Sequence, residues 1–278
     1  SGNVTLGAAW DLTTAQWLAG DRPGTLTVRA NGDLTISQSL GSPNDNILAG
    51  DTWNLRLVAG ADLSAANPLA TRGRSALSSG SLWLTGANAR LRTGTGRIDI
   101  AAADNVSIDN VASSIYTGGR IGAPDTEVQG NNRWAIDGGG ISVNAGGDLV
   151  GAAGRSGDLW INEWLRRPRN PNVAFAALQP TDWWSFRPRF QQGIGTLAGG
   201  DIDISAGGRI SDIAAALPTT GRTYRDAGNA RQVDVQGGGN LMVRAGEDID
   251  GSSFFVARGE GRVEAGGDIG TDRHTQLY

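Results

Sequence analysis

The amino-acid sequence predicts an all-β protein, a right-handed parallel β-helix (a solenoid) with loop and short-helix excursions. Three observations predict this fold. A short unit of alternating apolar residues recurs along the chain, and most copies run into a turn of the Ala-Gly-Gly-Asp type. Glycine makes up 43 of the 278 residues, about twice the usual share of ~7%. The last two copies place Asp248 and Asp268 20 residues apart, which suits one turn of a solenoid.

Each copy of the unit has the local chemistry of a strand followed by a tight corner. Alternation of the form Ile-x-Val places branched side chains on one face of a strand. Paired glycines permit a positive φ, and the following Asp is expected to cap nearby backbone N–H groups in an Asx-type turn. One apolar face cannot bury itself, so the copies are expected to stack into a continuous core. The copies are Leu26–Leu34, Leu55–Leu63, Ile98–Val106, Ile141–Leu149, Ile202–Ile210, Leu241–Ile249 and Val263–Ile269.

The corner glycines carry a specific expectation about backbone conformation. We expect Gly146, Gly207 or Gly266 to adopt a positive φ, so that replacing Gly266 by Val destabilises the domain by about 1 kcal/mol or more. A β-sandwich is the structural alternative, because short strands with glycine turns also suit it. The recurrence of one turn sequence favours the β-helix.

Three stretches break the repeat and are interpreted as excursions from one β-helix domain that spans residues 1–278. They are residues 110–137, 152–197 and 213–231. The largest, 152–197, is inserted in the domain and holds seven of the 17 aromatic residues and six arginines. Within it, Asp158–Arg167 is expected to form a short helix ended by Pro168.

Composition excludes several classes of function. The chain has no cysteine, and its one histidine is His274, so a disulfide framework, a zinc–thiolate site and a cysteine nucleophile are ruled out. The net charge of −4 argues against nonspecific binding of nucleic acid. No window approaches the ~20 apolar residues of a membrane span. We therefore expect no nucleic-acid partner, no membrane span, no metal, no cofactor and no catalytic residues.

Several segments occur in an order that resembles a known family. They are Trp10–Leu12, Pro23–Ala30, Leu57–Leu63, Arg92–Ile98, Ile115–Arg120 and Phe190–Gly195, the last leading into Leu197–Asp201. Together they resemble a domain of unknown function found toward the C-terminal part of filamentous-haemagglutinin-like exoproteins, which are large bacterial adhesins. The resemblance implies a Gram-negative protein secreted by the two-partner route, with an outer-membrane transporter as partner during export. It supplies no catalytic residues.

The largest excursion is the candidate ligand site. Tryptophan faces stack on sugar rings or peptide side chains, arginine pairs with carboxylates, and both residue types are enriched at interface hot spots. The competing interpretation is a self-packed subdomain, with Trp164, Trp183 and Trp184 forming a small core. Trp183 and Trp184 are adjacent, so we expect one to be buried and the other to be more exposed, beside Arg187 or Arg189. The candidate ligand-binding residues are Trp160, Trp164, Trp183, Trp184, Arg187 and Arg189.

Two pairs of aspartates have two possible interpretations, one enzymatic and one structural. Asp201 with Asp203, and Asp248 with Asp250, would each lie on one face of a strand, as the acids of β-helical polysaccharide-degrading enzymes do. The alternative, which we favour, is that they are turn caps and solvated positions.

The function expected from the sequence is a non-enzymatic structural or adhesive module of a large secreted bacterial exoprotein. The module would form the stalk or tip of a cell-surface adhesin and would be monomeric within a longer chain. One alternative is a tip that binds a host or bacterial surface glycan or receptor through residues 152–197. The other is a β-helical enzyme that degrades polysaccharides.

Overall fold

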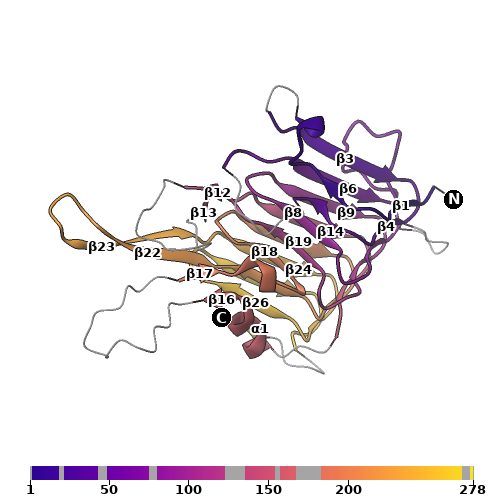
Figure 1. Cartoon of the computed structure of the whole chain (residues 1–278). Helices are drawn as coiled ribbons and strands as arrows, with labels where there is room; N and C mark the ends of the chain where they lie inside the picture. The colour runs from indigo at the N-terminus through magenta and orange to yellow at the C-terminus, as the bar shows by residue number, and fades with distance from the viewer. Residues whose placement is uncertain are drawn as a thin grey trace.

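The computed structural model shows an all-β protein whose core consists of three parallel sheets (Figure 1). It describes residues 2–18, 22–42, 49–74, 80–122, 135–153, 157–166, 183–270 and 276–277. Sheet I contains, in spatial order, β3 (Thr25–Ala30), β6 (Asn54–Ala59), β9 (Ile98–Ala102), β14 (Ile141–Ala145), β19 (Ile202–Ala206), β24 (Leu241–Ala245) and β27 (Gly261–Ala265). Sheet II contains β1 (Val4–Leu6), β4 (Leu34–Ile36), β7 (Leu82–Leu84), β10 (Val106–Ile108), β15 (Leu149–Gly151), β20 (Ile210–Ser211) and β25 (Ile249–Asp250). Sheet III contains β2 (Trp10–Asp11), β5 (Leu40–Gly41), β8 (Arg90–Thr93), β11 (Ser114–Thr117), β18 (Gly193–Thr196), β21 (Ala214–Leu217), β26 (Ser253–Val256) and β28 (Gln276–Leu277).

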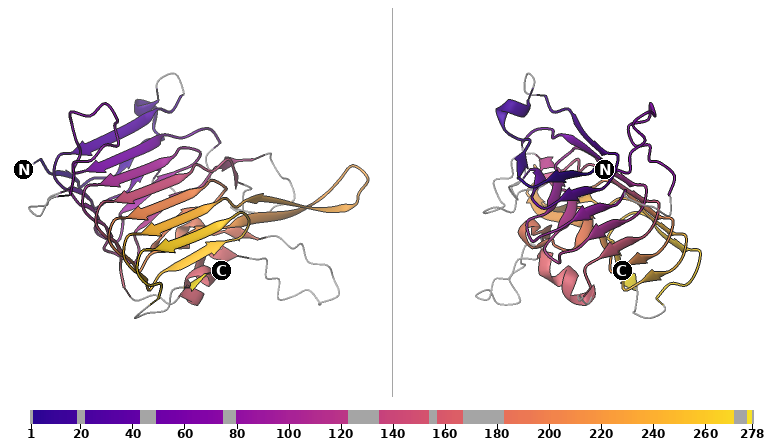
Figure 2. Two further views of the ribbon diagram at one scale, coloured as in Figure 1. Left: turned by 180° about the vertical axis from the view of Figure 1, so that it is seen from behind. Right: turned by 90° about the vertical axis from the view of Figure 1, so that its right-hand side faces the viewer.

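The chain visits the sheets in the order I, II, III and then returns to sheet I. One such passage is called a layer below, and successive layers lie side by side in Figure 2. Neighbouring strands in a sheet come from successive layers, so that Ile141 of β14 is in register with Ile98 of β9 and Ile202 of β19. The parallel pairing makes the β-sandwich alternative wrong, because the sheets of such sandwiches are antiparallel.

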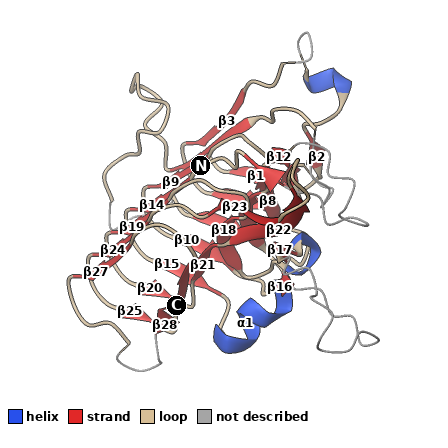
Figure 3. Cartoon of the chain, turned by 90° about the vertical axis from the view of Figure 1, so that its left-hand side faces the viewer, coloured by secondary structure: helices blue, strands red, loops and turns tan. Residues whose placement is uncertain are grey.

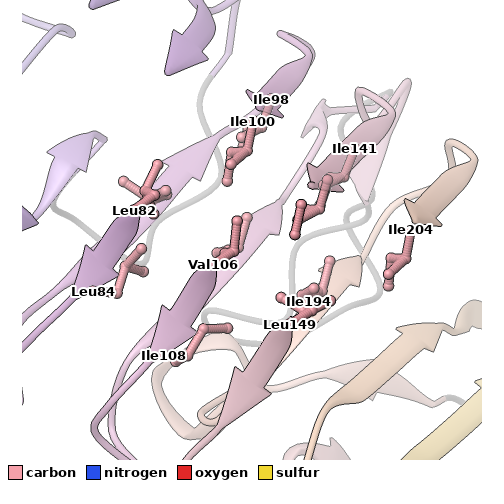
Figure 4. Packing of buried hydrophobic residues seen from close by; sticks show 14 of the residues in the cluster. Leu82, Leu84, Ile98, Ile100, Val106, Ile108, Ile141, Leu149, Ile194 and Ile204 are labelled. Carbon is pink, nitrogen blue, oxygen red and sulfur yellow. The ribbon is translucent and has the colours of Figure 1, made fainter. Parts of the chain in front are cut away.

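The core lies between the three sheets and is lined by the apolar face of each repeat. In β14, Ile141, Val143 and Ala145 are buried, whereas Ser142 and Asn144 are not, as a period-two pattern requires. Figure 4 shows aliphatic side chains of sheets I, II and III in this one cluster. The predicted strand pattern is therefore confirmed, and stacked branched side chains form the core.

The corner glycines do not have the backbone conformation that we expected. Gly146, Gly207 and Gly266 all lie outside the positive-φ region, so that prediction is wrong. They are needed for a different reason, which is close approach between layers. A Cβ on Gly207 would lie closer than 3.0 Å to the carbonyl oxygen of Gly146, and a Cβ on Gly266 equally close to that of Gly246. A side chain at these corners would therefore push adjacent layers apart.

The turn aspartates join one layer to the next. Asn105 Oδ1 accepts the backbone N–H of Asp148 at 2.7 Å, and Asp148 Oδ1 accepts that of Arg209 at 2.9 Å. Asp248 Oδ1 accepts the N–H of Asp268 in the same way, at 2.9 Å. These side-chain oxygens, two from aspartates and one from the amide of Asn105, therefore form a ladder between layers, where we expected caps within a single turn.

We expect the ladder to discriminate between asparagine and alanine at residue 148. Asp148→Ala removes the acceptor of the Arg209 N–H and should lower the free energy of unfolding by about 1 kcal/mol. Asp148→Asn keeps an Oδ1 acceptor, as Asn105 does in the preceding layer, and should retain most of the stability. Urea denaturation of both variants checks this. Equal losses in the two variants would show that the carboxylate charge, and not the hydrogen bond, stabilises the corner.

The predicted excursions are shorter than expected because each contains a strand of sheet III. These strands are β11 within 110–137, β18 within 152–197 and β21 within 213–231. The remaining insertions include the antiparallel pairs β12 (Arg120–Ile121) with β13 (Ala135–Ile136), and β22 (Thr219–Arg225) with β23 (Arg231–Gly237). Residues 123–134 lie outside the described part of the chain. Both pairs leave the layers between sheet III and sheet I, and the β22–β23 hairpin projects far from the sheets (Figure 1).

Asp226 organises the tip of the β22–β23 hairpin. Its carboxylate accepts hydrogen bonds from the Gln232 side chain and from the backbone N–H groups of Ala230 and Gly228, each at 2.9 Å. These bonds, the one from Gln232 foremost, hold the pKa of Asp226 below its usual range.

A lowered pKa in the folded state means that the charged carboxylate supports the hairpin tip at neutral pH. That support is lost as the pH falls through the lowered pKa. We expect the amide resonance of Gly228, followed by NMR, to titrate with a midpoint below the ordinary aspartate value of about 3.9. A midpoint at or above that value would contradict the assigned hydrogen bonds.

Candidate functional site

The largest insertion packs a short helix against the outer face of sheet III. It includes α1 (Gly157–Trp164), β16 (Leu165–Arg166), β17 (Trp184–Ser185) and the 3-10 turn η2 (Arg187–Arg189). Figure 3 shows α1 in blue, outside the three sheets. The helix ends at Trp164, three residues before the expected end, because the chain turns there into β16, which pairs with β17. Among the described residues no helix has the length and apolar character needed to cross a membrane.

Trp160 and Trp164 form the centre of a second, aromatic core. Their exposed fractions are 1% and 0%, and both rings contact Phe190, at centroid distances of 5.7 and 5.4 Å. Tyr116 and Phe255 of sheet III complete the cluster. Edge-to-face geometry of this kind adds to the burial energy of aromatic rings. The prediction that Trp160 and Trp164 bind a ligand is therefore corrected, because neither indole is accessible.

Two glycines of β18 make room for this aromatic core. Ile194 points into the main core, so Gly193 and Gly195 lie on the outer face of the strand. A Cβ on Gly193 would come within 2.8 Å of the Trp160 ring, and one on Gly195 within 2.5 Å of the Phe190 ring. The Gly-Ile-Gly sequence is thus a flat platform for the rings.

The remaining four candidate residues, Trp183, Trp184, Arg187 and Arg189, differ in burial and in their contacts. Trp183 and Trp184 are both half-buried, so the expected division into one buried and one exposed ring is wrong. Trp183 packs on Gly221 of the hairpin and donates its indole N–H to Thr219 Oγ1 at 3.1 Å. Strand β22 therefore covers the ring of Trp183. Arg187 is 8% exposed and Arg189 is exposed.

The acidic pairs are partly explained by the corners of the fold. Asp201 Oδ1 accepts the backbone N–H of Asn240 at 2.7 Å, and Asp248 takes part in the ladder already described. Asp203 is exposed and Asp250 half-buried. Within the described ranges, no three or more histidine, cysteine, aspartate or glutamate side chains are grouped so as to hold a metal ion.

A pocket that sequence analysis missed lies between sheet III and sheet I. It has a volume of about 260 Å³ and is situated at the carboxyl ends of β5 and β8. Its wall includes Leu12, Thr13, Asp51, Trp53, Arg92 and Thr93. Only the clustering of Trp10, Trp17 and Trp53 in the first part of the chain signals this site in the sequence.

The Trp53 ring is held in place by aromatic neighbours. It meets Trp17 edge-on, with centroids 6.3 Å apart and an interplanar angle of 83°, and Trp17 stacks on Trp10 at 5.8 Å. Gly24 lies against the six-membered ring of Trp53, where a Cβ would come within 3.0 Å. The indole Nε1–H of Trp53 is buried and has no hydrogen-bond acceptor within the described structure.

Hydrogen bonds fix the polar side of the pocket. Thr52 Oγ1 accepts the backbone N–H groups of Gly94 and Gly96 at 2.8 and 3.0 Å, which joins the segment before β6 to the turn after β8. Arg92 is only 4% exposed, and its guanidinium lies 5.5 Å from the centre of the Tyr116 ring. This cation–π contact connects the pocket to the aromatic core.

Taken together, these features define an all-β protein of parallel sheets with an aromatic core on one outer face and a mixed polar and apolar pocket at a corner. Comparison of the chain with protein-family models, with curated proteins and with solved structures gave no match.

Proposed function

We propose that the chain is a right-handed parallel β-helix that serves as a non-enzymatic structural and adhesive module of a large secreted bacterial exoprotein. It would act at the surface of a Gram-negative bacterium, after export through an outer-membrane transporter. The ordered segments that resemble filamentous-haemagglutinin-like exoproteins support this proposal, together with the three parallel sheets.

The observation that carries the proposal is the unbroken stacking of layers. Apolar columns run from strand to strand through each sheet, and side-chain-to-backbone hydrogen bonds repeat at the corners. In such an architecture each layer is stabilised by its neighbours. Stability can therefore be extended along a stalk, which is what an adhesin needs to hold a binding tip away from the cell.

Two insertions and the Trp53 pocket support an adhesive role because they lie on the same side of the stack. The β12–β13 and β22–β23 pairs and the Trp53 pocket all lie between sheet III and sheet I. Loops on a rigid scaffold can vary without disturbing the core, and binding residues concentrate in them. The layers would then supply the rod, and this side the contacts.

The proposal is tested in the bacterium that carries the gene. Antibodies raised against the 278-residue chain are expected to label intact cells, and deletion of the outer-membrane transporter should abolish that labelling. An in-frame deletion of the chain should reduce attachment to host or neighbouring bacterial cells. Labelling that requires cell lysis would refute surface exposure. Release of reducing ends from polysaccharides by the purified chain would refute the non-enzymatic role.

A further inference from the structure

We propose that the Trp53 pocket binds a single neutral sugar ring. The inference stands apart from the proposed structural role, because it rests only on the geometry of this pocket. It also moves the candidate ligand site away from the insertion at 152–197, whose tryptophans Trp160 and Trp164 are buried.

The size of the pocket limits the ligand to one ring. Its volume of about 260 Å³ falls just below the range of about 300–1,000 Å³ that holds drug-sized ligands. A pyranose is small enough to enter, whereas a longer oligosaccharide would extend into solvent and place only one residue in the pocket.

The lining combines an apolar face with hydrogen-bonding groups, as a sugar does. Leu12 and Trp53 provide apolar surface, and Thr13 and Thr93 provide hydroxyl groups. A pyranose presents C–H groups on one face, which pack on an aromatic ring, and hydroxyls around its rim. The Thr13 hydroxyl already donates to Asp11 and the Thr93 hydroxyl to the carbonyl group of Gly96, so both would serve a sugar as acceptors of hydrogen bonds.

Trp53 carries both parts of the recognition. Contacts with Trp17 and Gly24 restrict its ring, so little rotational freedom is lost when a ligand packs on it. Its buried Nε1–H has no acceptor in the described structure, and buried polar groups are nearly always hydrogen-bonded. A sugar hydroxyl beside the indole would supply that acceptor.

Asp51 supplies a further acceptor in the wall of the pocket. Its side chain is 65% exposed and lies 3.8 Å from Arg120, whose closer partner is Asp137 at 2.8 Å. The carboxylate therefore remains available to accept hydrogen bonds from sugar hydroxyls. The wall also contains Arg92, so one positive and one negative charge are present. This balance favours a neutral ligand over an acidic one.

The test measures sugar binding by the purified 278-residue chain. Methyl pyranosides of glucose, galactose, mannose, fucose and N-acetylglucosamine are titrated and followed by tryptophan fluorescence and saturation-transfer NMR. Glucuronic acid and amino-acid amides serve as charged and non-sugar probes. We expect at least one neutral pyranoside to bind, and to bind more tightly than the two other classes.

Two variants assign that binding to the pocket. Trp53→Phe keeps an aromatic ring but removes the indole N–H, and Asp51→Asn removes the carboxylate charge. Each is expected to weaken binding about tenfold or more. The matched controls Trp83→Phe, on a strand of sheet II, and Asp268→Asn, at a distant corner, should bind as the parent does.

Three results would overturn the assignment. They are the absence of binding by every neutral pyranoside, tighter binding of the acidic sugar or an amino-acid amide, and parental affinity in both pocket variants. If Trp53→Phe does not fold, the Asp51→Asn variant tests the assignment alone, because Asp51 is highly exposed and its substitution should not prevent folding. Loss of surface labelling in the bacterium would leave this result unchanged, so the two proposals fail separately.

Discussion

Replacing Trp164 by alanine is expected to detach α1 from sheet III and to cost about 3–5 kcal/mol of stability in that region. Trp164 is completely buried and contacts the rings of Trp160, Phe190 and Phe255 at 5.4, 5.4 and 6.1 Å. The substitution removes the largest apolar surface at the centre of the aromatic core. Because the main core lies on the other face of sheet III, the three parallel sheets should stay folded.

Hydrogen–deuterium exchange separates this local effect from global unfolding. In the Trp164→Ala variant, peptides covering 157–166 should exchange much faster, whereas peptides from sheet I should exchange as in the parent. The matched control is Phe186→Ala, since Phe186 is 38% exposed and its loss should cost about 1 kcal/mol or less. Faster exchange in all three sheets would show instead that the aromatic core is required by the whole stack.

The second large effect is expected from Gly207→Ala, which should lower the free energy of unfolding by about 3 kcal/mol. The added methyl group would meet the carbonyl oxygen of Gly146, and Gly207 is itself approached by Gly246 of the next layer. Backbone atoms on both sides cannot move aside as a flexible side chain does. The two adjacent layers would therefore have to separate.

Gly7→Ala is the matched control for this substitution. A Cβ at Gly7 meets no atom within 4 Å, and its φ is not positive. Alanine there should leave stability unchanged or raise it by about 0.4–1 kcal/mol, because it restricts the unfolded chain. Chemical denaturation of both variants provides the measurement. If Gly207→Ala were as stable as the parent, the layers would be less closely packed than the structure indicates.

We still expect Gly266→Val to destabilise the protein, but for a different physical reason. We expected the cost from a positive φ, yet Gly266 has no such conformation. The cost now follows from the carbonyl oxygen of Gly246, which lies where the side chain would begin. Only glycine fits at this corner, but a glycine in a sequence does not reveal whether a positive φ or a lack of space for a side chain requires it.

The aromatic residues also show that the sequence indicates which residues pack but not which neighbours they contact. Their excess in residues 152–197 correctly indicated a packed feature, and a self-packed core was one of the two interpretations. Its members were different, however, since Trp160 and Phe190 belong to it and Trp183 packs on the β22–β23 hairpin. Which rings meet depends on where Gly193 and Gly195 open the outer face of sheet III.

What the sequence by itself determined is the strand content and the apolar face of each strand. Alternation within a unit such as Ile141–Ala145 is a local property of the sequence. Its apolar face must be covered by neighbouring units, whatever the sequence of the rest of the chain. Only the tertiary structure decided which corners carry the insertions, why Asp148 joins one layer to the next, and that Leu12, Trp53 and Arg92 line one pocket. These contacts arise between layers, so they depend on register and on the lengths of insertions. Neither quantity is encoded in any short stretch of residues, because each is set by the packing of the whole stack.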